Sequence, residues 1–321
     1  MHPEASVVIP TYNRRAMVRE AALSVLAQRE AHFELIVIDD GSTDGSDKDL
    51  ARLQIECGGK HSGPMRVERI ENRGVAAARN RGVALARAPL IAFLDSDDLW
   101  MPSKLARQLD FMRTHPECEI SQCQESWIRD GRRVNPGQRH LKRGGDLFLD
   151  SLRTCIVSVS AVILRTDLFQ AYGGFDEAMR ACEDYDLWLR ILVTREIGLL
   201  DEVLLQRRAG HPDQLSATVP ALDRFRILSL IKLLANSHLG AARRQAAAQA
   251  LAEKCGIYAK GLRRRGRESA ALQIERIAEY ALDDWRAAPS DSIAIAAAAV
   301  RRIGAQHSDS QSPFPHDEEI A

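Results

Sequence analysis

The 321-residue chain lacks paired cysteines, an excess of either charge and any long apolar run. Its six cysteines are scattered without paired spacing, which in a chain of this length indicates reduced thiols rather than a disulfide framework. Lys plus Arg and Asp plus Glu each total 44, so the formal net charge is zero. This balance argues against a general nucleic-acid-binding protein.

No apolar stretch approaches the roughly 20 residues needed to span a bilayer. The longest, at residues 293–300, is short and rich in alanine. The first residues also lack the basic and then apolar pattern of a secretion signal. These absences predict a cytoplasmic protein, and they leave open a peripheral contact with the inner face of the membrane.

What the chain does contain is an alternation of strand-like and helical patterns. Strands are predicted at 6–10, 33–38, 66–71 and 90–94, with helices at 14–28 and 74–86. Such alternation predicts parallel βαβ units, whose strand-end loops meet at one edge of the sheet, where ligands bind. No G-x-x-x-x-G-K loop follows Gly41, and no G-x-G-x-x-G follows the first strand, which disfavours nucleoside triphosphatases and nicotinamide dehydrogenases.

The strongest chemical signal follows the fourth predicted strand, where Asp95, Asp97 and Asp98 crowd within four residues. Carboxylates at the end of a buried strand repel one another unless a cation or hydrogen-bond donors offset their charge. Carboxylate oxygens suit Mg²⁺ or Mn²⁺, so the cluster is a candidate metal site. The alternative is an acidic loop that caps the helix beginning near Pro102.

Polar residues also follow the other predicted strands, at 11–13, 39–42 and 72–73. Each group taken alone is compatible with a helix cap, a turn or a solvated side chain. Because all of them end strands at the same edge of the sheet, together they predict a site for a polar ligand.

Four blocks of sequence, at 6–14, 38–44, 72–80 and 93–98, resemble the family 2 glycosyltransferases in order and spacing. The resemblance extends from about Ser6 to about Ser216. It implies an α/β fold of the GT-A type, a mostly parallel sheet flanked by helices, over residues 1–218. The nucleotide-binding half would cover about 1–100 and the acceptor half 101–218.

The resemblance also implies a donor site that binds a nucleotide-diphosphate sugar, with a UDP-sugar as the leading donor, and a divalent metal, Mn²⁺ or Mg²⁺. Asp97 would ligate the metal and His211 would complete its shell, while Arg207 and Arg208 would neutralise phosphate oxygens. The residues implied to contact the donor are Pro10, Thr11, Asn13, Asp40, Arg79, Asp95 and Ser96.

A second acidic group, around 176–186, follows two glycines and begins a helix. Carboxylates there are ordinary helix-dipole chemistry, which composition alone favours. The resemblance implies instead that Asp184 is the general base that takes the proton from the acceptor hydroxyl, with Asp186 structural. The residues implied on the acceptor side are Trp100, Gly174, Asp176 and Glu183.

The rest of the acceptor half and the C-terminal region show weaker patterns. A strand is expected at 155–164, a loop at 134–146, and helices at 222–235, 241–265, 267–285 and 292–303. The helices would form an extension at 219–304 that packs on the catalytic domain or on a second copy in a homodimer. Residues 305–321 are expected to be disordered.

The leading interpretation is an inverting, metal-dependent glycosyltransferase that acts on a hydroxyl of a glycan or a lipid-linked glycan of the cell envelope. Two alternatives belong to other classes. A nucleotidyltransferase also uses strand-end carboxylates and a metal, but a glycine- and arginine-rich phosphate loop is missing near the N-terminus. A non-catalytic nucleotide-sugar-binding protein would retain the fold without needing both Asp97 and Asp184.

Overall fold

The computed structural model describes residues 2–58, 65–129, 131–135, 137, 141–210, 214, 218–235, 239–284 and 290–305. The chain divides into two compact units, 1–214 and 215–321. The division falls close to the predicted boundary at residue 218. The predicted tail, 305–321, lies outside the described residues from 306 onward.

The first half of the larger unit is built on four parallel strands. They are β1 (Ala5–Thr11), β2 (Phe33–Asp39), β3 (Met65–Arg69) and β4 (Leu90–Phe93), and β1 lies between β2 and β4. Every residue of β1 and β2 is buried, which explains their nearly continuous apolar sequences. Two of the polar exceptions are paired with each other, since the Ser6 hydroxyl donates to Glu34 at 2.7 Å.

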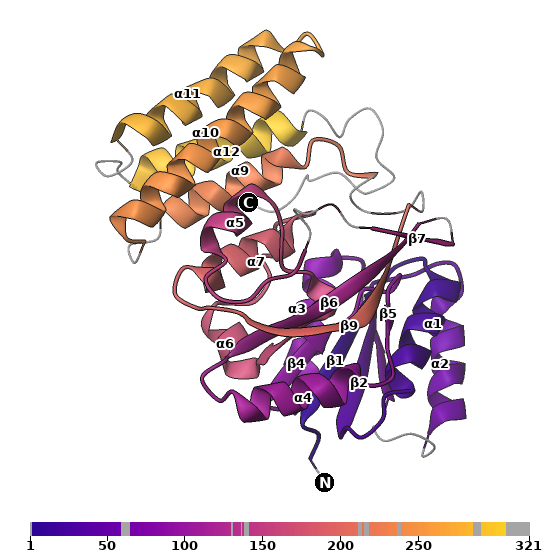
Figure 1. The fold of residues 1–321 in the computed structure, drawn as a ribbon. Coiled ribbons are helices and arrows are strands. Elements are labelled where there is room, and N and C mark those ends of the chain that lie inside the picture. Colours follow the sequence, from indigo (N-terminus) through magenta and orange to yellow (C-terminus); the bar gives the residue numbers. More distant parts are fainter. Residues whose placement is uncertain are drawn as a thin grey trace. The chain divides into compact units, whose positions relative to one another are not determined.

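Three helices connect these strands and cover both faces of the sheet. They are α1 (Arg15–Leu26), α2 (Ser46–Cys57) and α3 (Val75–Leu85). The buried sides of α1 and α2, which pack side by side (Figure 1), share a core with Val7, Leu35 and Val37. Ala78 of α3 packs on the opposite face, against Ile36 and Ile38. The predicted βαβ arrangement is therefore confirmed, with successive strand residues facing opposite helix layers.

The second half continues the same sheet with strands in mixed directions. In chain order they are β5 (Leu99–Trp100), β6 (Ile120–Arg129), β7 (Arg132–Val134), β8 (Val162–Arg165) and β9 (Gly198–Ala209). The strand order is β3-β2-β1-β4-β8-β6-β9-β5, and β7 pairs with β6. Strand β8 runs antiparallel to both β4 and β6, so the sheet is parallel in its first half and mixed beyond β4.

Among the described residues, four further α-helices complete this half, and two of them, α6 (Thr166–Ala171) and α7 (Glu183–Leu192), pack beside β4 through an aromatic cluster. The other two are α4 (Lys104–Thr114) and α5 (Phe148–Arg153). The Phe175 ring lies 5.3 Å from that of Phe93 on β4 and 6.4 Å from that of Trp188 on α7. This packing brings the start of α7 next to the end of β4.

The strand expected at 155–164 was predicted too long. Only Val162–Arg165 is strand, and a short 3₁₀ helix, η2 (Val159–Ala161), precedes it. Side chains take the place of a strand partner there. The Trp100 indole N–H donates to the Ser160 carbonyl at 2.9 Å, and the Gln108 amide donates to the Ala161 carbonyl at 3.0 Å. These bonds hold the backbone of η2 close to the acidic cluster.

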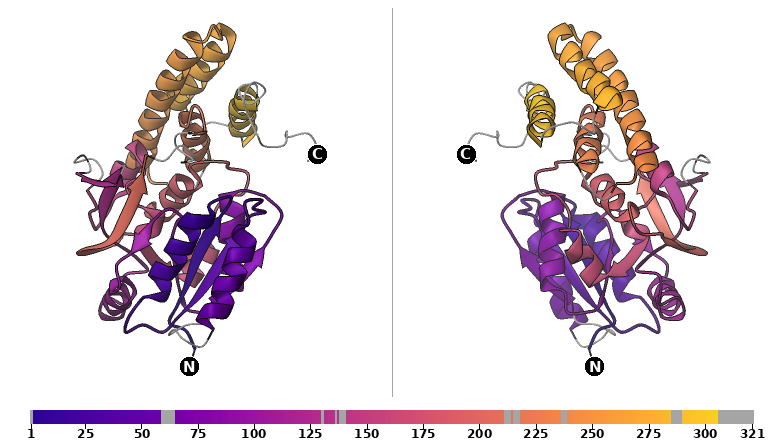
Figure 2. Two further views of the ribbon diagram at one scale, coloured as in Figure 1. Left: turned by 90° about the vertical axis from the view of Figure 1, so that its right-hand side faces the viewer. Right: turned by 90° about the vertical axis from the view of Figure 1, so that its left-hand side faces the viewer.

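The smaller unit is helical, as predicted. It contains α9 (Asp223–Leu234), α10 (Ala241–Arg263), α11 (Glu268–Asp284) and α12 (Ser290–Ala305). Helices α10 and α11 form a long hairpin (Figure 2), with Gly266 at φ +71° in the turn and an Arg263–Glu268 ion pair of 2.9 Å across it. None of the described helices is both long and apolar enough to cross a bilayer.

Candidate active site

The acidic cluster lies directly after β4, where the fold gathers its strand ends. The backbone N–H of Leu94 still bonds to the Val8 carbonyl of β1, and the Asp95 N–H then turns to the Ser160 hydroxyl at 3.1 Å. One carboxylate oxygen from each of Asp95, Asp97 and Asp98 lies within 4.8 Å of the others. The crowding predicted from the sequence is therefore real.

Each acid of this cluster has a partner that offsets part of its charge. Asp95 pairs with Arg79 at 2.7 Å, and Asp97 pairs with Arg14 at 2.8 Å. Asp98 accepts the backbone N–H of Arg208 at 3.0 Å. Burial raises the pKa of Asp98 well above its usual range, and the charges of Asp97 and Asp95 raise it further. The cluster is thus a set of hard oxygen donors whose repulsion is not fully balanced, which fits a divalent cation.

Arg79 on α3 connects the first and second halves of the larger unit. Its side chain is 5% exposed and bonds to Asp95 and, at 2.5 Å, to Glu183 at the start of α7. Burial alone would lower the pKa of the guanidinium, but the charges of Asp95 and Glu183 outweigh it and raise the pKa. Because both ends of the guanidinium bind carboxylates of the protein, the implied contact of Arg79 with the donor stays a prediction.

The loops after β1 and β2 are held together by their own polar side chains. The Asn13 N–H donates to the Ser42 hydroxyl at 2.9 Å, and the Thr43 N–H donates to the Asn13 side-chain oxygen at 2.7 Å. The two carboxylate oxygens of Asp40 accept the N–H groups of Arg73 and Gly74, each at 2.9 Å. Burial raises the pKa of Asp40 despite these bonds.

Three further residues implied on the donor side lie at the end of β1 or in the cluster. Thr11 is buried and its carbonyl accepts the Asp40 N–H at 2.9 Å, while Pro10 lies beside Ile38 in the β1–β2 register. Ser96 is buried between the acids. A pocket of about 460 Å³, lined by Gly41, Arg69, Ile70, Glu71 and Asn72, opens next to these loops. The site loops are therefore preorganised, and their ligand contacts stay predictions.

Asp184, the implied general base, is the second residue of α7. Its Oδ2 lies 3.4 Å from the thiol of Cys155, and its neighbour Glu183 is buried against Arg79. Asp186, expected to be structural, is 1% exposed and pairs with Arg190 at 2.9 Å. The residue before the helix, Cys182, has a φ of +60°, a left-handed conformation that is uncommon for a residue with a side chain.

The residues implied on the acceptor side differ in their surroundings. Trp100 is only 4% exposed, because its ring packs in the core with the Lys104 ammonium 3.8 Å from the ring centre. Gly174 has a φ of +67°, and Asp176 accepts the Ala178 N–H at 2.9 Å. The roles of these three residues towards an acceptor stay predictions. His211 lies outside the described residues.

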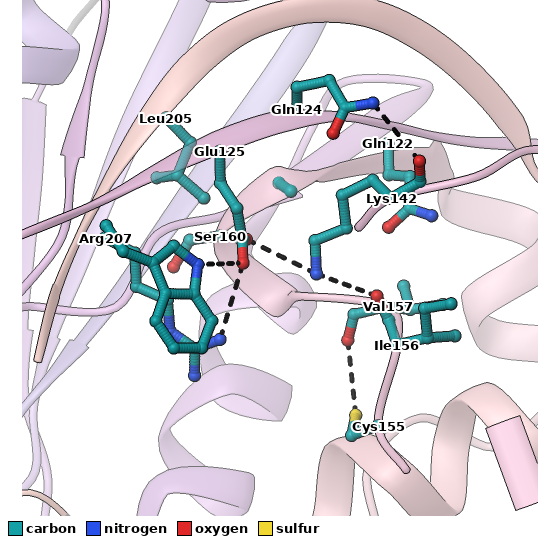
Figure 3. A network of polar contacts seen from close by, with 12 residues as sticks. Gln122, Gln124, Glu125, Lys142, Cys155, Ile156, Val157, Ser160, Leu205 and Arg207 are labelled. Atoms are coloured by element: carbon teal, nitrogen blue, oxygen red, sulfur yellow. Dashed lines mark hydrogen bonds and ion pairs between the residues drawn. The ribbon is translucent and has the colours of Figure 1, made fainter. Parts of the chain in front are cut away.

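Sequence reasoning missed a buried network next to the site (Figure 3). The Trp127 indole N–H donates to Oε1 of Glu125 at 2.8 Å, and the Lys142 ammonium lies 3.5 Å from Oε2. Lys142 also donates to the Ile156 carbonyl at 2.8 Å, and Arg207 lies 3.8 Å from Glu125. No local pattern signals this network, because its members come from β6, β9 and two loops.

Arg207 connects the network to the acidic cluster. Its guanidinium lies 5.1 Å from the centre of the Trp127 ring. Burial alone would lower its pKa, yet surrounding carboxylates raise it, in decreasing order Glu125, Asp98, Asp95 and Asp184. The positive charge of Arg207 therefore interacts both with the acids after β4 and with Asp184 of α7.

The fold is of the GT-A type, and solved structures with this fold resemble the chain over almost its whole length. S. aureus TarS 1–349, solved in complex with UDP-GlcNAc, has a TM-score of 0.65 at 18% identity and covers 97% of this chain and 93% of its own. The mannosyltransferase PcManGT from Pyrobaculum calidifontis, solved with GDP-Man and Mn²⁺, has a TM-score of 0.55 at 18% identity, with coverage of 97% and 89%.

The family model for glycosyl transferase family 2 matches residues 6–173, and the chain belongs to this family. An uncharacterized glycosyltransferase of Rickettsia felis is 35% identical over 205 residues, which cover 64% of this chain and 33% of the relative. The putative teichuronic acid biosynthesis glycosyltransferase TuaG of Bacillus subtilis is 42% identical over 110 residues, 34% of this chain and 42% of the relative. The match thus spans about a third of the Rickettsia felis protein's length.

Proposed function

We propose that the protein transfers a sugar from a nucleotide-diphosphate donor to an acceptor hydroxyl, with inversion at the anomeric carbon. The observation that carries this proposal is the pairing of two separate acidic groups across one site. Asp95, Asp97 and Asp98 form an acidic cluster after β4 that would hold a cation, and Asp184 is the second residue of α7, on the proposed acceptor side. A single displacement needs both, a charge that stabilises the leaving diphosphate and a base for the hydroxyl.

Asp97 would hold the divalent metal, together with His211 and with Asp95 or Asp98. A bound Mn²⁺ or Mg²⁺ would stabilise the negative charge that develops on the diphosphate as the glycosidic bond breaks. Arg207 adds a positive charge of the protein itself in the same place, and the Arg208 guanidinium bonds to the Asp97 carbonyl and so lies close to the cluster. These groups support the assignment of the leaving-group side.

Asp184 would accept the proton of the acceptor hydroxyl as the new bond forms. Glu183 beside it pairs with Arg79, whereas Asp184 contacts the Cys155 thiol, so the two adjacent acids have different partners. Trp100, Gly174, Asp176 and Glu183 would shape the acceptor side. Pro10, Thr11, Asn13, Asp40, Arg79, Asp95 and Ser96 would line the donor.

The donor and acceptor classes are proposed from the relatives. The UDP-GlcNAc complex of TarS supports a UDP-sugar donor, and the Mn²⁺ complex of PcManGT supports a metal. The name of TuaG supports a glycan acceptor of the cell envelope, in free or lipid-linked form. A cytoplasmic location, a peripheral membrane contact and a homodimer through the C-terminal helices belong to the same proposal.

The experiment is a panel of nucleotide-sugars assayed for release of nucleoside diphosphate with and without Mn²⁺. Asp97→Asn should keep the fold, since it is nearly isosteric, and lose most of the turnover. Asp110→Asn is the matched control, because Asp110 is exposed on α4 and pairs with Arg113. Undiminished turnover of Asp97→Asn at limiting Mn²⁺ would rule out the ligand role. Absence of turnover with every donor would favour a non-catalytic binding protein.

A further inference from the structure

The ion pair between Arg14 and Asp97 places a protein cation on the carboxylate assigned to the metal. Nη1 of Arg14 lies 2.8 Å from Oδ2 of Asp97, and the two side chains are 16% and 12% exposed. Arg14 immediately precedes α1, so the contact joins the loop after β1 to the loop after β4. A guanidinium at this position supplies one of the positive charges that the acidic cluster requires.

Two other arginines that face the cluster, Arg79 and Arg207, are held by further carboxylates. Arg79 is 5% exposed and bound to both Asp95 and Glu183, and Arg207 lies near Glu125 and over Trp127. Moving Arg79 away would leave the buried Glu183 without the cation that pairs with it, which is costly. The guanidinium of Arg14 contacts the Asp97 carboxylate itself, so the acid that it would leave is the one that gains the metal.

We propose, on the basis of the function proposed above, that Arg14 occupies the metal's place on Asp97 and competes with the divalent cation for it. Two cations that approach the same carboxylate repel each other, so the metal displaces the guanidinium. A nucleoside diphosphate that arrives with the metal offers the released guanidinium a new anionic partner. The competition therefore weakens the binding of metal alone and favours its binding together with the nucleotide.

The consequence is a measurable linkage between Mn²⁺, UDP and the Arg14 side chain at one site. Loss of the competitor should raise the affinity of the nucleotide-free protein for Mn²⁺ roughly two- to fivefold, the range set by a partly exposed ion pair. The factor by which UDP enhances Mn²⁺ binding should shrink at the same time, because part of that enhancement comes from Arg14.

The test measures Mn²⁺ affinity from the electron paramagnetic resonance signal of free Mn²⁺, in the full chain, with and without UDP. Arg14→Gln should bind Mn²⁺ more tightly than wild type. Arg15→Gln is the matched control. The Arg15 guanidinium pairs with Asp49 on the surface, so its removal should leave the Mn²⁺ affinity unchanged. Thermal unfolding in EDTA establishes that each variant is folded.

Arg14→Lys separates displacement from a general effect of nearby charge. Lysine keeps the charge but replaces the planar fork by a flexible, strongly hydrated ammonium, so displacement predicts an affinity between those of wild type and Arg14→Gln. An affinity of Arg14→Lys equal to wild type, or of Arg14→Gln no higher than wild type, would overturn the inference. If wild type binds no Mn²⁺ even with UDP, the metal site itself is wrong, and that outcome is distinct.

Discussion

The thiol of Cys155 lies 3.4 Å from Oδ2 of Asp184, in contact with the carboxylate proposed as the general base. Burial raises the pKa of this thiol well above its usual range, and the charge of Asp184 raises it further. Cys155 therefore remains protonated at neutral pH and can donate its proton to the carboxylate. A thiol is a weak donor, so it orients the carboxylate while leaving its basicity largely intact.

Asp184→Asn should make Cys155 more reactive towards iodoacetamide, because removal of the neighbouring charge lowers the pKa of the thiol and thiolate is the reactive form. Mass spectrometry of alkylated peptides at several pH values would measure the rate at each cysteine. Cys118 is an internal control, since the acids that raise its pKa are Glu117 and Glu196. Unchanged alkylation of Cys155 would show that the carboxylate does not control the thiol.

The same substitution should separate catalysis from donor binding. A general base acts on the acceptor in the transition state, so Asp184→Asn should lower kcat on the order of 10²–10⁴-fold. Calorimetry should find nearly wild-type affinity for UDP and Mn²⁺. If transfer continued at close to the wild-type rate, Glu183 or Asp176 would be the next carboxylate to examine.

Adjacent glycines before the acceptor-side acids provide a matched pair. Both have positive φ, +73° at Gly173 and +67° at Gly174. A Cβ on Gly174 would come 2.8 Å from the Asn80 side-chain oxygen, whereas one on Gly173 would meet no atom within 4 Å. Gly173→Ala should cost about 1–2 kcal/mol of unfolding free energy through backbone strain alone.

Gly174→Ala should cost more than Gly173→Ala, because it also displaces Asn80. That side chain accepts the Phe175 N–H at 3.0 Å and donates to its carbonyl at 2.8 Å. Denaturant unfolding of the two variants gives the comparison directly. Equal losses of stability would mean that the Asn80 side chain can move at no cost in free energy and that its hydrogen bonds to Phe175 do not stabilise the loop.

The Glu125–Lys142 pair should contribute to stability as a unit. Lys142→Met leaves a buried carboxylate without that partner and should cost about 3–5 kcal/mol. Adding Glu125→Gln should then cost less than it does in the wild-type background. The exposed pair of Arg107 and Glu202 is the control, and Glu202→Gln should change stability by less than about 1 kcal/mol. Strictly additive losses at Glu125 and Lys142 would contradict the pairing.

The same carboxylate predicts a pH dependence. Burial would raise the pKa of Glu125, but the charges of Lys142 and Arg207 outweigh it and the pKa falls below its ordinary value of 4.5. A carboxylate whose pKa is lowered in the folded state stabilises that state at pH values above the ordinary pKa. This contribution is lost as the pH falls through the folded-state pKa. Unfolding free energy measured against pH should therefore decline less in acid for Glu125→Gln than for wild type. Parallel declines would show that Glu125 titrates normally.

The strands and their polar ends were predictable because their signals are local. The apolar runs before Thr11, Asp40 and Asp95 each end in a polar residue, and topology then brings those residues to one edge. The burial of Lys142 was not predictable in this way. It stands in a stretch that reads as a solvated basic loop, and its partners Glu125 and the Ile156 carbonyl are brought to it only by the tertiary fold.

The 3₁₀ helix η2 was missed for a related reason. The sequence at 155–164 has the β-branched composition of a strand. In the structure, however, the carbonyls of Ser160 and Ala161 accept hydrogen bonds from the Trp100 and Gln108 side chains instead of from a neighbouring strand. The partner of Arg79 in the site was unpredictable for the same reason, because the sequence around Arg79 on α3 does not indicate that it pairs with Glu183. Tertiary hydrogen bonds decided these features, and periodicity does not record them.

The bridge that Arg79 makes between Asp95 and Glu183 bears on how such enzymes can be recombined. A chimaera that joined the first half of this sheet to the second half of another protein's sheet would need an acid at the start of the incoming α7 helix. Without it, a buried guanidinium would retain a single carboxylate and lose half of its compensation. Interchange of the second half is therefore restricted by the need for an acid that pairs with Arg79, whatever ligand the loops bind.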